Sequence, residues 1–318
     1  MSRTIVLAIL SVALGLVALG ARTLGARAIE NQAAKTADAT DAAADAGAGQ
    51  PEIVVASLSD LDRMAAEHQH DRPAATPAAT AAPAQPVGAE EIAFGEVQGQ
   101  PARGYLARPR TPPAGAHLPG LIVIHEWWGL NHNIKATTRR LAGEGYTALA
   151  VDLYGGKVAD NPDAAKQLAG AAMANRDAAF AVLRAADDYL KRQGAPKIGV
   201  IGWCFGGGWS LQTALEIPPG IDAAVMYYGQ PEKDRARLER LRAPLLGLFG
   251  ADDKSIPPAA VHELEATLKQ LGKTADFHIY EGAGHAFANP SGTNYRPAAA
   301  EDAWQRTVAF FKQHLKGA

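Results

Sequence analysis

The sequence predicts an α/β protein with a mostly parallel, doubly wound sheet flanked by helices in a three-layer α/β/α arrangement. From about residue 90 onward, short apolar runs alternate with longer stretches whose apolar residues recur at three- and four-residue spacing. Most of the short runs are apolar throughout, which is typical of strands covered on both faces. Hydrophobic residues make up 47% of the chain. Many are alanines in the first ninety positions, so we expect one core, in one domain, downstream.

The first 28 residues are expected to be a signal peptide. Arg3 supplies positive charge, residues 5–19 are apolar apart from one serine and one glycine, and Ala26 and Ala28 are small residues at the positions that a signal peptidase inspects. We expect cleavage after Ala28 and export, to the periplasm. The alternative is an uncleaved anchor, although the run is shorter than the roughly 20 residues that span a bilayer. Only that alternative makes the membrane a partner.

Residues 29–89 are rich in alanine, aspartate, threonine and proline and are predicted to be a disordered spacer. Within them, residues 51–69 hold enough apolar side chains for a short amphipathic helix or docking segment, but a spacer is the favoured interpretation. His68 and His70 lack a third ligand, so they are weak indicators of a metal site.

The domain is expected at residues 90–318. It should open with an antiparallel pair of strands at 91–97 and 103–108. Further strands are predicted at 121–125, 147–151, 198–203, 223–228, 245–249 and 277–280. Helices are predicted at 134–144, 163–173, 176–193, 206–215, 257–271 and 301–315. Ligands bind beyond the carboxyl ends of the strands in such sheets, so the residues that follow each apolar run are the candidates for chemistry.

Charge and cysteine content narrow the function classes. The net charge is −2, which gives no strong field to attract nucleic acid or anionic lipid, so a small-molecule partner is expected. The single cysteine excludes an intramolecular disulfide and a multi-cysteine metal site. The sequence contains no nucleotide-binding loop and no metal-ligand cluster, and no cofactor is predicted.

A thiol stands where a predicted strand meets a predicted helix. Residues 202–207 read G-W-C-F-G-G, the pattern of a nucleophile elbow with cysteine in place of serine. A Cβ at Gly202 or Gly206 would collide with the neighbouring strand or helix, and the helix N-terminus favours the thiolate. A lone cysteine is more often a small buried hydrophobe. Because strand, bracketed thiol and glycine-opened helix occur in the required order, Cys204 is predicted to be the nucleophile.

A cysteine nucleophile needs a base, and the base needs a carboxylate that fixes its tautomer. His285 lies in a glycine-rich turn after the strand at 277–280, a setting that none of the other histidines shares. The strand at 245–249 is followed by Asp252 and Asp253. We select Asp253, four residues before the proline that opens the next helix, and keep Asp252 as the alternative. Either could merely cap that helix, but the chain order Cys, Asp, His is that of an elbow-type triad.

The loop at residues 125–131, H-E-W-W-G-L-N, is expected beside the elbow. The backbone N–H groups of Trp127 and Phe205 are predicted to form the oxyanion hole. Glu126, an ionisable group at the end of a buried strand, could hydrogen-bond the resting thiol. The alternative is a carboxylate paired with a nearby arginine or histidine.

Together these motifs resemble the dienelactone hydrolase family, the carboxymethylenebutenolidases and their relatives in the α/β-hydrolase superfamily. The resemblance runs from about residue 91 to the C-terminus. It rests on the elbow, the 125–131 loop, D-L-Y at 152–154, the Asp253 loop and G-H-A-F at 284–287.

The resemblance implies an α/β-hydrolase fold and a triad of Cys204, Asp253 and His285. It implies that Glu126 holds the resting thiol until substrate displaces it. The thiolate would then attack a lactone carbonyl, and water would cleave the thioester with His285 as general base.

The sequence departs from the family pattern where a substrate carboxylate is bound. Members that act on dienelactone carry an arginine just after D-L-Y and another four residues beyond the catalytic histidine. Here two glycines and Lys157 follow Tyr154, and the second place holds Asn289. An arginine fork binds a carboxylate in a way that lysine does not reproduce, so we expect a different ester or lactone. The predicted substrate-binding residues are Trp128, Tyr154, Lys157, Asn289 and Arg296.

The leading hypothesis is a cysteine-dependent hydrolase that cleaves small esters or enol lactones through a thioester acyl-enzyme. One alternative keeps the fold but acts as a thioesterase or general carboxylesterase. Another is a non-catalytic ligand-binding envelope protein, which would have no need of an intact nucleophile, base and acid.

Overall fold

The computed structural model describes residues 58–74, 76, 81–112 and 115–317. The predicted signal peptide or anchor, at 1–28, and the first half of the predicted spacer lie outside these residues. Among the described helices, none is both long and apolar enough to cross a lipid bilayer.

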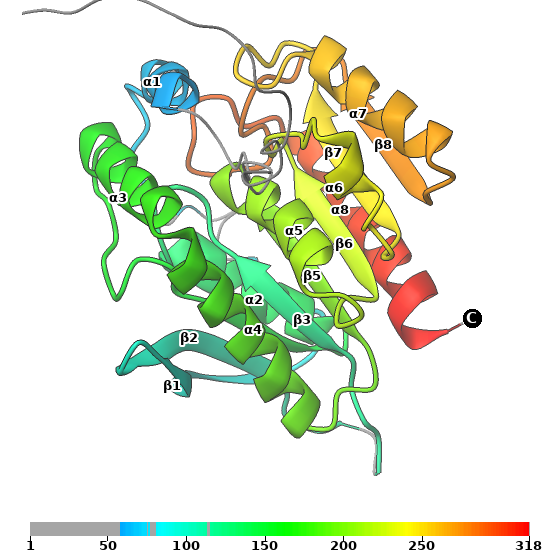
Figure 1. The fold of residues 1–318 in the computed structure, drawn as a ribbon. Coiled ribbons are helices and arrows are strands. Elements are labelled where there is room, and N and C mark those ends of the chain that lie inside the picture. The colour runs from blue at the N-terminus through cyan, green and yellow to red at the C-terminus, as the bar shows by residue number, and fades with distance from the viewer. Residues whose placement is uncertain (1–57, 75, 77–80, 113–114, 318) are drawn as a thin grey trace, which may run out of the picture. The chain divides into compact units, whose positions relative to one another are not determined.

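One sheet forms the middle layer of the domain (Figure 1). Its described strands run in the order β1-β2-β4-β3-β5-β6-β7-β8. The pairs β1/β2 and β2/β4 are antiparallel and all the others are parallel, so the predicted mostly parallel sheet with an antiparallel opening is confirmed. The strands are β1 (Val87–Val97), β2 (Gln100–Pro109), β3 (Gly120–Ile124), β4 (Thr147–Val151), β5 (Ile198–Trp203), β6 (Ala223–Tyr227), β7 (Leu245–Gly250) and β8 (Ala275–Tyr280).

Helices cover both faces of this sheet, which confirms the three predicted layers. In Figure 1, α4 (Arg176–Arg192) and α5 (Phe205–Glu216) lie in front of the sheet, and α2 (His132–Gly143) and α8 (Pro297–Phe311) lie behind it. The other described helices are α1 (Leu58–Glu67), α3 (Pro162–Ala174), α6 (Arg235–Leu238) and α7 (Pro258–Gln270), and a π-helical turn, η1 (Lys312–Lys316), follows α8.

The central strands are apolar because both of their faces are covered. Every residue of β3 and β5 is buried. A Cβ at Gly199 of β5 would come within 3 Å of the side chains of Leu121, Phe311 and Leu315. Glycine at this position therefore lets the C-terminal helix and its last turn pack directly on the strand that leads to Cys204.

Helix α1 lies where the sequence favoured a spacer. Leu61 is fully buried and Met64 nearly so, and both belong to the core cluster of the domain. A ten-residue helix is marginal by itself, so this burial stabilises α1 where local sequence does not. The ordered chain also reaches β1 at Val87, three residues before the expected domain start.

Candidate active site

Loops that follow four parallel strands bring the predicted catalytic residues to one edge of the sheet. Glu126 follows β3, Cys204 follows β5, Asp253 follows β7 and His285 follows β8. All four side chains are buried. They come from neighbouring carboxyl ends of the sheet, the place where open α/β sheets bind ligands.

The turn that carries Cys204 has the strained geometry of a nucleophile elbow. Cys204 has φ 55° and ψ −119°, which a residue with a side chain rarely adopts, and its N–H donates to the carbonyl of Tyr227 at 3.0 Å. A Cβ on Gly202 would overlap the carbonyl of Gly206, and one on Gly206 would overlap the carbonyl of Ile124. Both glycines are therefore required for α5 to start directly behind the thiol.

Asp253 is the carboxylate that meets His285. Its Oδ2 lies 2.9 Å from Nδ1 of His285, and both side chains are completely buried. Its Oδ1 accepts the backbone N–H groups of Ser255 at 2.8 Å and Ile256 at 2.7 Å. Asp252, the alternative left open above, is exposed. The contacts of Asp253 fix the orientation of the imidazole ring.

The environment of His285 favours its charged form. Burial alone would lower the pKa of His285, but the negative charges of Asp253 and Cys204 outweigh burial and raise this pKa well above 6.5. Nε2 of His285 is buried without a hydrogen-bond partner among the described residues. The ring lines the same small cavity as Cys204. His285 is thus placed to accept the thiol proton.

Glu126 is held in its neutral form. Burial raises the pKa of Glu126 to about 8. The positive charge of His285 opposes this rise, and the negative charge of Asp71 adds to it. The side-chain amide of Asn289 donates to Oε2 of Glu126 at 2.9 Å. Asn289 is predicted to bind substrate, and in this structure its side-chain amide binds this carboxyl group.

Glu126 does not hold the resting thiol, contrary to what the resemblance implied. Its described hydrogen bonds do not include one to Cys204. The thiol sulfur of Cys204 lies 3.3 Å from the thioether sulfur of Met64, a residue of α1. The methionine side chain fills the space next to the thiol, and the Asn289 amide engages the carboxyl group of Glu126.

The 125–131 loop lies against the elbow, as the sequence predicted. The ring of His125 stacks on Phe205 with a centroid distance of 5.9 Å, and Trp127 packs edge-on against Trp128 at 5.0 Å. Phe205 is the first residue of α5, so its N–H has no acceptor within the helix. Trp128, predicted to contact substrate, is buried in this aromatic packing.

Lys157 and Arg296 lie away from the cavity at Cys204, whereas Tyr154 packs beside the elbow. Tyr154 is buried against His125 and Phe205, and burial together with the charge of Cys204 raises its pKa well above 10. Lys157 is exposed and lines other hollows of the surface. Arg296 donates to the carbonyls of Gly282 and Tyr295. Neither cation lines the cavity at Cys204, so the structure does not bring them there as carboxylate-binding groups.

The cavity beside Cys204 has walls that sequence reasoning missed. Its volume is about 10 Å³, and Leu61, Met64, Tyr228 and Ile256 contribute to its lining. Tyr228 directly follows β6 and has φ 37°, so the rule that selects residues after each strand could have found it. The two α1 residues offered no such signal, because they lie in the segment interpreted as a spacer.

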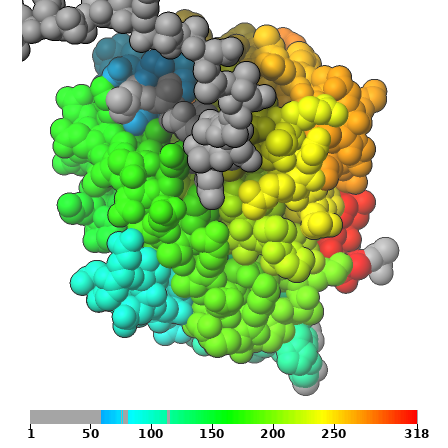
Figure 2. Space-filling view, viewed as in Figure 1, coloured from blue at the N-terminus to red at the C-terminus, as the bar shows by residue number. Residues whose placement is uncertain are grey.

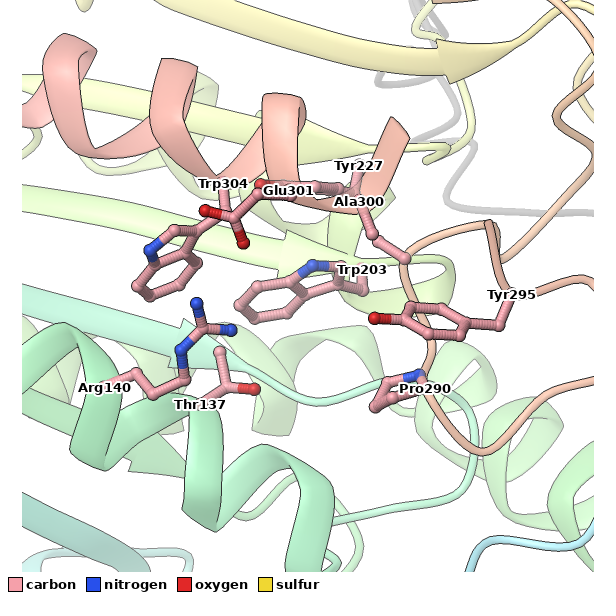
Figure 3. A pocket seen from close by; sticks show the side chains of 10 residues that line it. Thr137, Arg140, Trp203, Tyr227, Pro290, Tyr295, Ala300, Glu301 and Trp304 are labelled. Atoms are coloured by element: carbon pink, nitrogen blue, oxygen red, sulfur yellow. The ribbon is translucent and has the colours of Figure 1, made fainter. Parts of the chain in front are cut away.

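The side chain of Trp203, the residue before Cys204, packs on the other face of the sheet, between α2 and α8. Its indole lies with Arg140, Tyr295 and Trp304 in a separate pocket of about 70 Å³ (Figure 3). The guanidinium carbon of Arg140 is 3.9 Å from the ring centre of Trp304, a cation–π contact between α2 and α8. The tryptophan of the G-W-C motif therefore anchors the end of β5 and is not part of the cavity at the thiol.

Glu67, Asp253 and His285 have potential metal-ligand atoms within 4.8 Å of one another. The hydrogen bonds of these residues give a different account of the cluster. Asp253 binds His285 and two backbone N–H groups, and Glu67 accepts the hydroxyl of Ser255 at 2.9 Å. We therefore interpret the cluster as a hydrogen-bonded acid and base with α1 docked beside them.

The chain is similar to known proteins over most of the domain. The profile of the dienelactone hydrolase family matches residues 102–315. "Protein usf" of Aquifex pyrophilus is 40% identical over 228 residues, which are 69% of this chain and 96% of that protein. A protein of Saccharolobus solfataricus named "Putative carboxymethylenebutenolidase" is 32% identical over 264 residues, 71% of this chain and 100% of that protein.

A solved structure shares the fold over the same region. The crystal structure from Klebsiella pneumoniae described as a "Putative Dienelactone Hydrolase" has a TM-score of 0.64 and 32% identity, and it covers 72% of this chain and 100% of its own. This likeness confirms the predicted α/β-hydrolase fold.

Proposed function

Because the chain belongs to the dienelactone hydrolase family, we propose that it is a cysteine-dependent hydrolase that cleaves small esters or enol lactones through a thioester. The observation that carries the proposal is the convergence of Cys204 on a strained elbow with the buried His285–Asp253 pair. An elbow that exposes one sulfur to a base held by a carboxylate is suited to acyl transfer.

In the first half of the reaction, the proton of Cys204 passes to Nε2 of His285 and the thiolate attacks the carbonyl carbon. The N–H groups of Phe205 and Trp127 are proposed to stabilise the oxyanion. When the tetrahedral intermediate collapses, the carbon–oxygen bond breaks, and the leaving alkoxide or enolate takes a proton from the imidazolium. An enolate leaves readily, which favours enol lactones.

In the second half, water attacks the thioester carbonyl. Neutral His285 takes a proton from the water, the carbon–sulfur bond breaks, and sulfur leaves as the thiolate beside the imidazolium. The charges of Asp253 and Cys204 that raise the pKa of His285 support the imidazolium of this pair, and transfer of its proton to sulfur restores the thiol for the next cycle.

Turnover of p-nitrophenyl acetate and of protoanemonin-like lactones tests the proposal. We expect Cys204→Ala to lose activity by at least about 10³-fold, and mass spectrometry of a quenched reaction to detect an acyl group on Cys204 of the wild type. Cys204→Ser is the matched control for loss of sulfur with little change of shape. Full turnover by Cys204→Ala would refute the proposal.

A general carboxylesterase of the same fold is the second candidate. The observation that favours it is the composition of the cavity at Cys204, where Phe205 and Ile256 are apolar and where neither Lys157 nor Arg296 reaches. Such walls suit an uncharged acyl group better than a carboxylate. A panel of p-nitrophenyl esters of increasing chain length beside the lactones would separate the two activities by their ratio of kcat/KM.

We also propose that the chain is exported. The charged Arg3, the apolar run at 5–19 and the small residues at Ala26 and Ala28 support this. In a Gram-negative host, the mature protein should appear in the periplasmic fraction with Ile29 as its first residue. A full-length chain in the membrane fraction would instead support the anchor.

A further inference from the structure

Helix α1 occupies the space next to the predicted nucleophile. The thioether sulfur of Met64 lies 3.3 Å from the thiol sulfur of Cys204. With Leu61 and Met64 in place, the cavity measures about 10 Å³. One water molecule needs roughly 10–15 Å³ on this measure. An ester or lactone therefore cannot reach Cys204 while α1 is seated.

The helix presents one face to the site and the other to solvent. Leu61, Met64 and His68 are buried at helical spacing, whereas Asp62 and Arg63 are exposed. Asp62 forms an ion pair with Lys166 of α3, and Figure 2 shows the blue α1 beside the green α3. An exposed pair of this kind contributes little to the free energy of seating.

Polar anchors hold the buried end of α1. Nδ1 of His68 lies 2.6 Å from Oδ2 of Asp71, and Oδ1 of Asp71 accepts both the backbone N–H and the hydroxyl of Thr293 at 2.8 Å. Ser255 donates its hydroxyl to Glu67 at 2.9 Å. These bonds tie α1 to the loop that carries Asp253 and to the loop that follows His285.

The side chains of the segment also rest on the predicted oxyanion loop and base. The ring of His68 lies 5.3 Å from that of Trp127 and 5.7 Å from that of His285, and His68 is 1% exposed. Asp71 contributes to the raised pKa of Glu126. One short segment thus contacts the nucleophile, the base and the loop of the oxyanion hole at the same time.

We propose that residues 58–71 are a built-in plug: Met64 and Leu61 occupy the pocket of the substrate acyl group, and the segment must swing away before Cys204 can react. This proposal rests on the proposed function, in which Cys204 is the nucleophile of a hydrolase. It also names a substrate class, because the space filled by the unbranched side chain of Met64 suits an unbranched, apolar acyl group. The apparent reactivity of Cys204 then scales with the fraction of molecules in which the plug is open.

Two full-chain variants that act on the plug by different routes test this. Asp71→Asn removes the charge that His68 and Thr293 bind, and Met64→Ala empties the pocket without changing charge. For both we expect alkylation of Cys204 by iodoacetamide, followed by mass spectrometry, to be at least about tenfold faster than in the wild type. The same factor is expected in kcat/KM for p-nitrophenyl butyrate.

Matched controls lie away from the plug. Asp276→Asn breaks an exposed aspartate–histidine pair on β8, and Val308→Ala shortens a half-buried apolar side chain on α8. Neither should change the alkylation rate. Hydrogen–deuterium exchange of the peptide that covers 58–71 reports whether Asp71→Asn has released the segment.

The outcomes separate the plug from the proposed chemistry. Alkylation that stays unchanged or slows in both plug variants, with exchange of 58–71 increased, would overturn the plug, even if esters are hydrolysed. Faster alkylation without any ester or lactone turnover would uphold the plug and refute the proposed function.

Discussion

Asn289 donates its side-chain amide to the buried carboxyl group of Glu126, 2.9 Å away. The amide carries no charge that would favour the carboxylate, and burial, only partly opposed by the charge of His285, raises the pKa of Glu126 to about 8. Near neutral pH the carboxyl group of Glu126 is therefore protonated in the folded chain. In the unfolded chain, where this group has its ordinary pKa of 4.5, it has released the proton.

Replacement of this acid should change how stability depends on pH. Between about pH 5 and pH 8 Glu126 holds a proton in the folded chain that it has released in the unfolded chain, so its contribution to the free energy of unfolding falls as pH rises through this window. Glu126→Gln removes that contribution. As pH rises from 5 to 8, the free energy of unfolding of the variant should increase relative to that of the wild type by up to about 1.4 kcal/mol per pH unit. Above pH 8 this difference should stay constant. Urea unfolding of both proteins at pH 5, 6.5 and 8 measures the difference; parallel curves would contradict the prediction.

Asp253→Asn should lower kcat. The amide cannot hold His285 in the orientation and tautomer that leave Nε2 free to accept a proton, so we expect a loss on the order of 10²–10⁴-fold. Steady-state kinetics with p-nitrophenyl acetate measures it. Asp252→Asn, one residue away and exposed, is the control and should retain full activity. Equal losses in both variants would remove Asp253 from its proposed role.

The two glycines of the elbow should tolerate no side chain. Gly206→Ala places a methyl group on the carbonyl of Ile124, and the backbone of β3 cannot move without disturbing the sheet. We expect the free energy of unfolding to fall by at least about 3 kcal/mol. Gly170→Ala, in the interior of α3 and with only Leu61 nearby, is the control and should be neutral or slightly stabilising. Thermal and urea unfolding compare them.

The sequence predicted the sheet and the catalytic edge well, because both depend on local patterns. Continuous apolar runs identify buried strands, and the residues after three of these runs are Cys204, Asp253 and His285, which the fold brings together without long loops. Spacing favoured Asp253 but left Asp252 open, and the contact of Asp253 with His285 decides between them. Local pattern succeeds here because strand ends are ordered by the topology of the sheet.

Contacts over long stretches of chain could not be predicted in this way. Met64 meets Cys204 across 140 residues, and Asp71 meets Thr293 across 222. Their segment has enough apolar residues for a short helix, but its local sequence does not indicate that the helix packs against Cys204. Asn289 shows the same limit, since its position suggested substrate binding whereas its amide is committed to Glu126.

Tyr228 should matter more for turnover than for folding. Its hydroxyl is buried without a hydrogen-bond partner among the described residues, and burial together with the negative charges of Glu126 and Cys204 raises its pKa well above 10, so it stays protonated. A buried hydroxyl without a partner costs roughly 1–3 kcal/mol. Tyr228→Phe should therefore leave the free energy of unfolding unchanged or raise it by about that amount.

The same hydroxyl lies at the cavity of Cys204, where a bound substrate would bring oxygen atoms within reach. We expect Tyr228→Phe to lower kcat/KM by about tenfold, because the donor that the folded chain leaves unused would find its acceptor in the reacting ester. Kinetics and urea unfolding on the same preparation measure both effects. Tyr146→Phe, a second buried tyrosine with an unpartnered hydroxyl, lies outside the cavity and is the control. If both variants gain stability but only Tyr228→Phe loses activity, the Tyr228 hydroxyl acts on substrate. If neither variant loses activity, the Tyr228 hydroxyl has no role in turnover and the prediction is wrong.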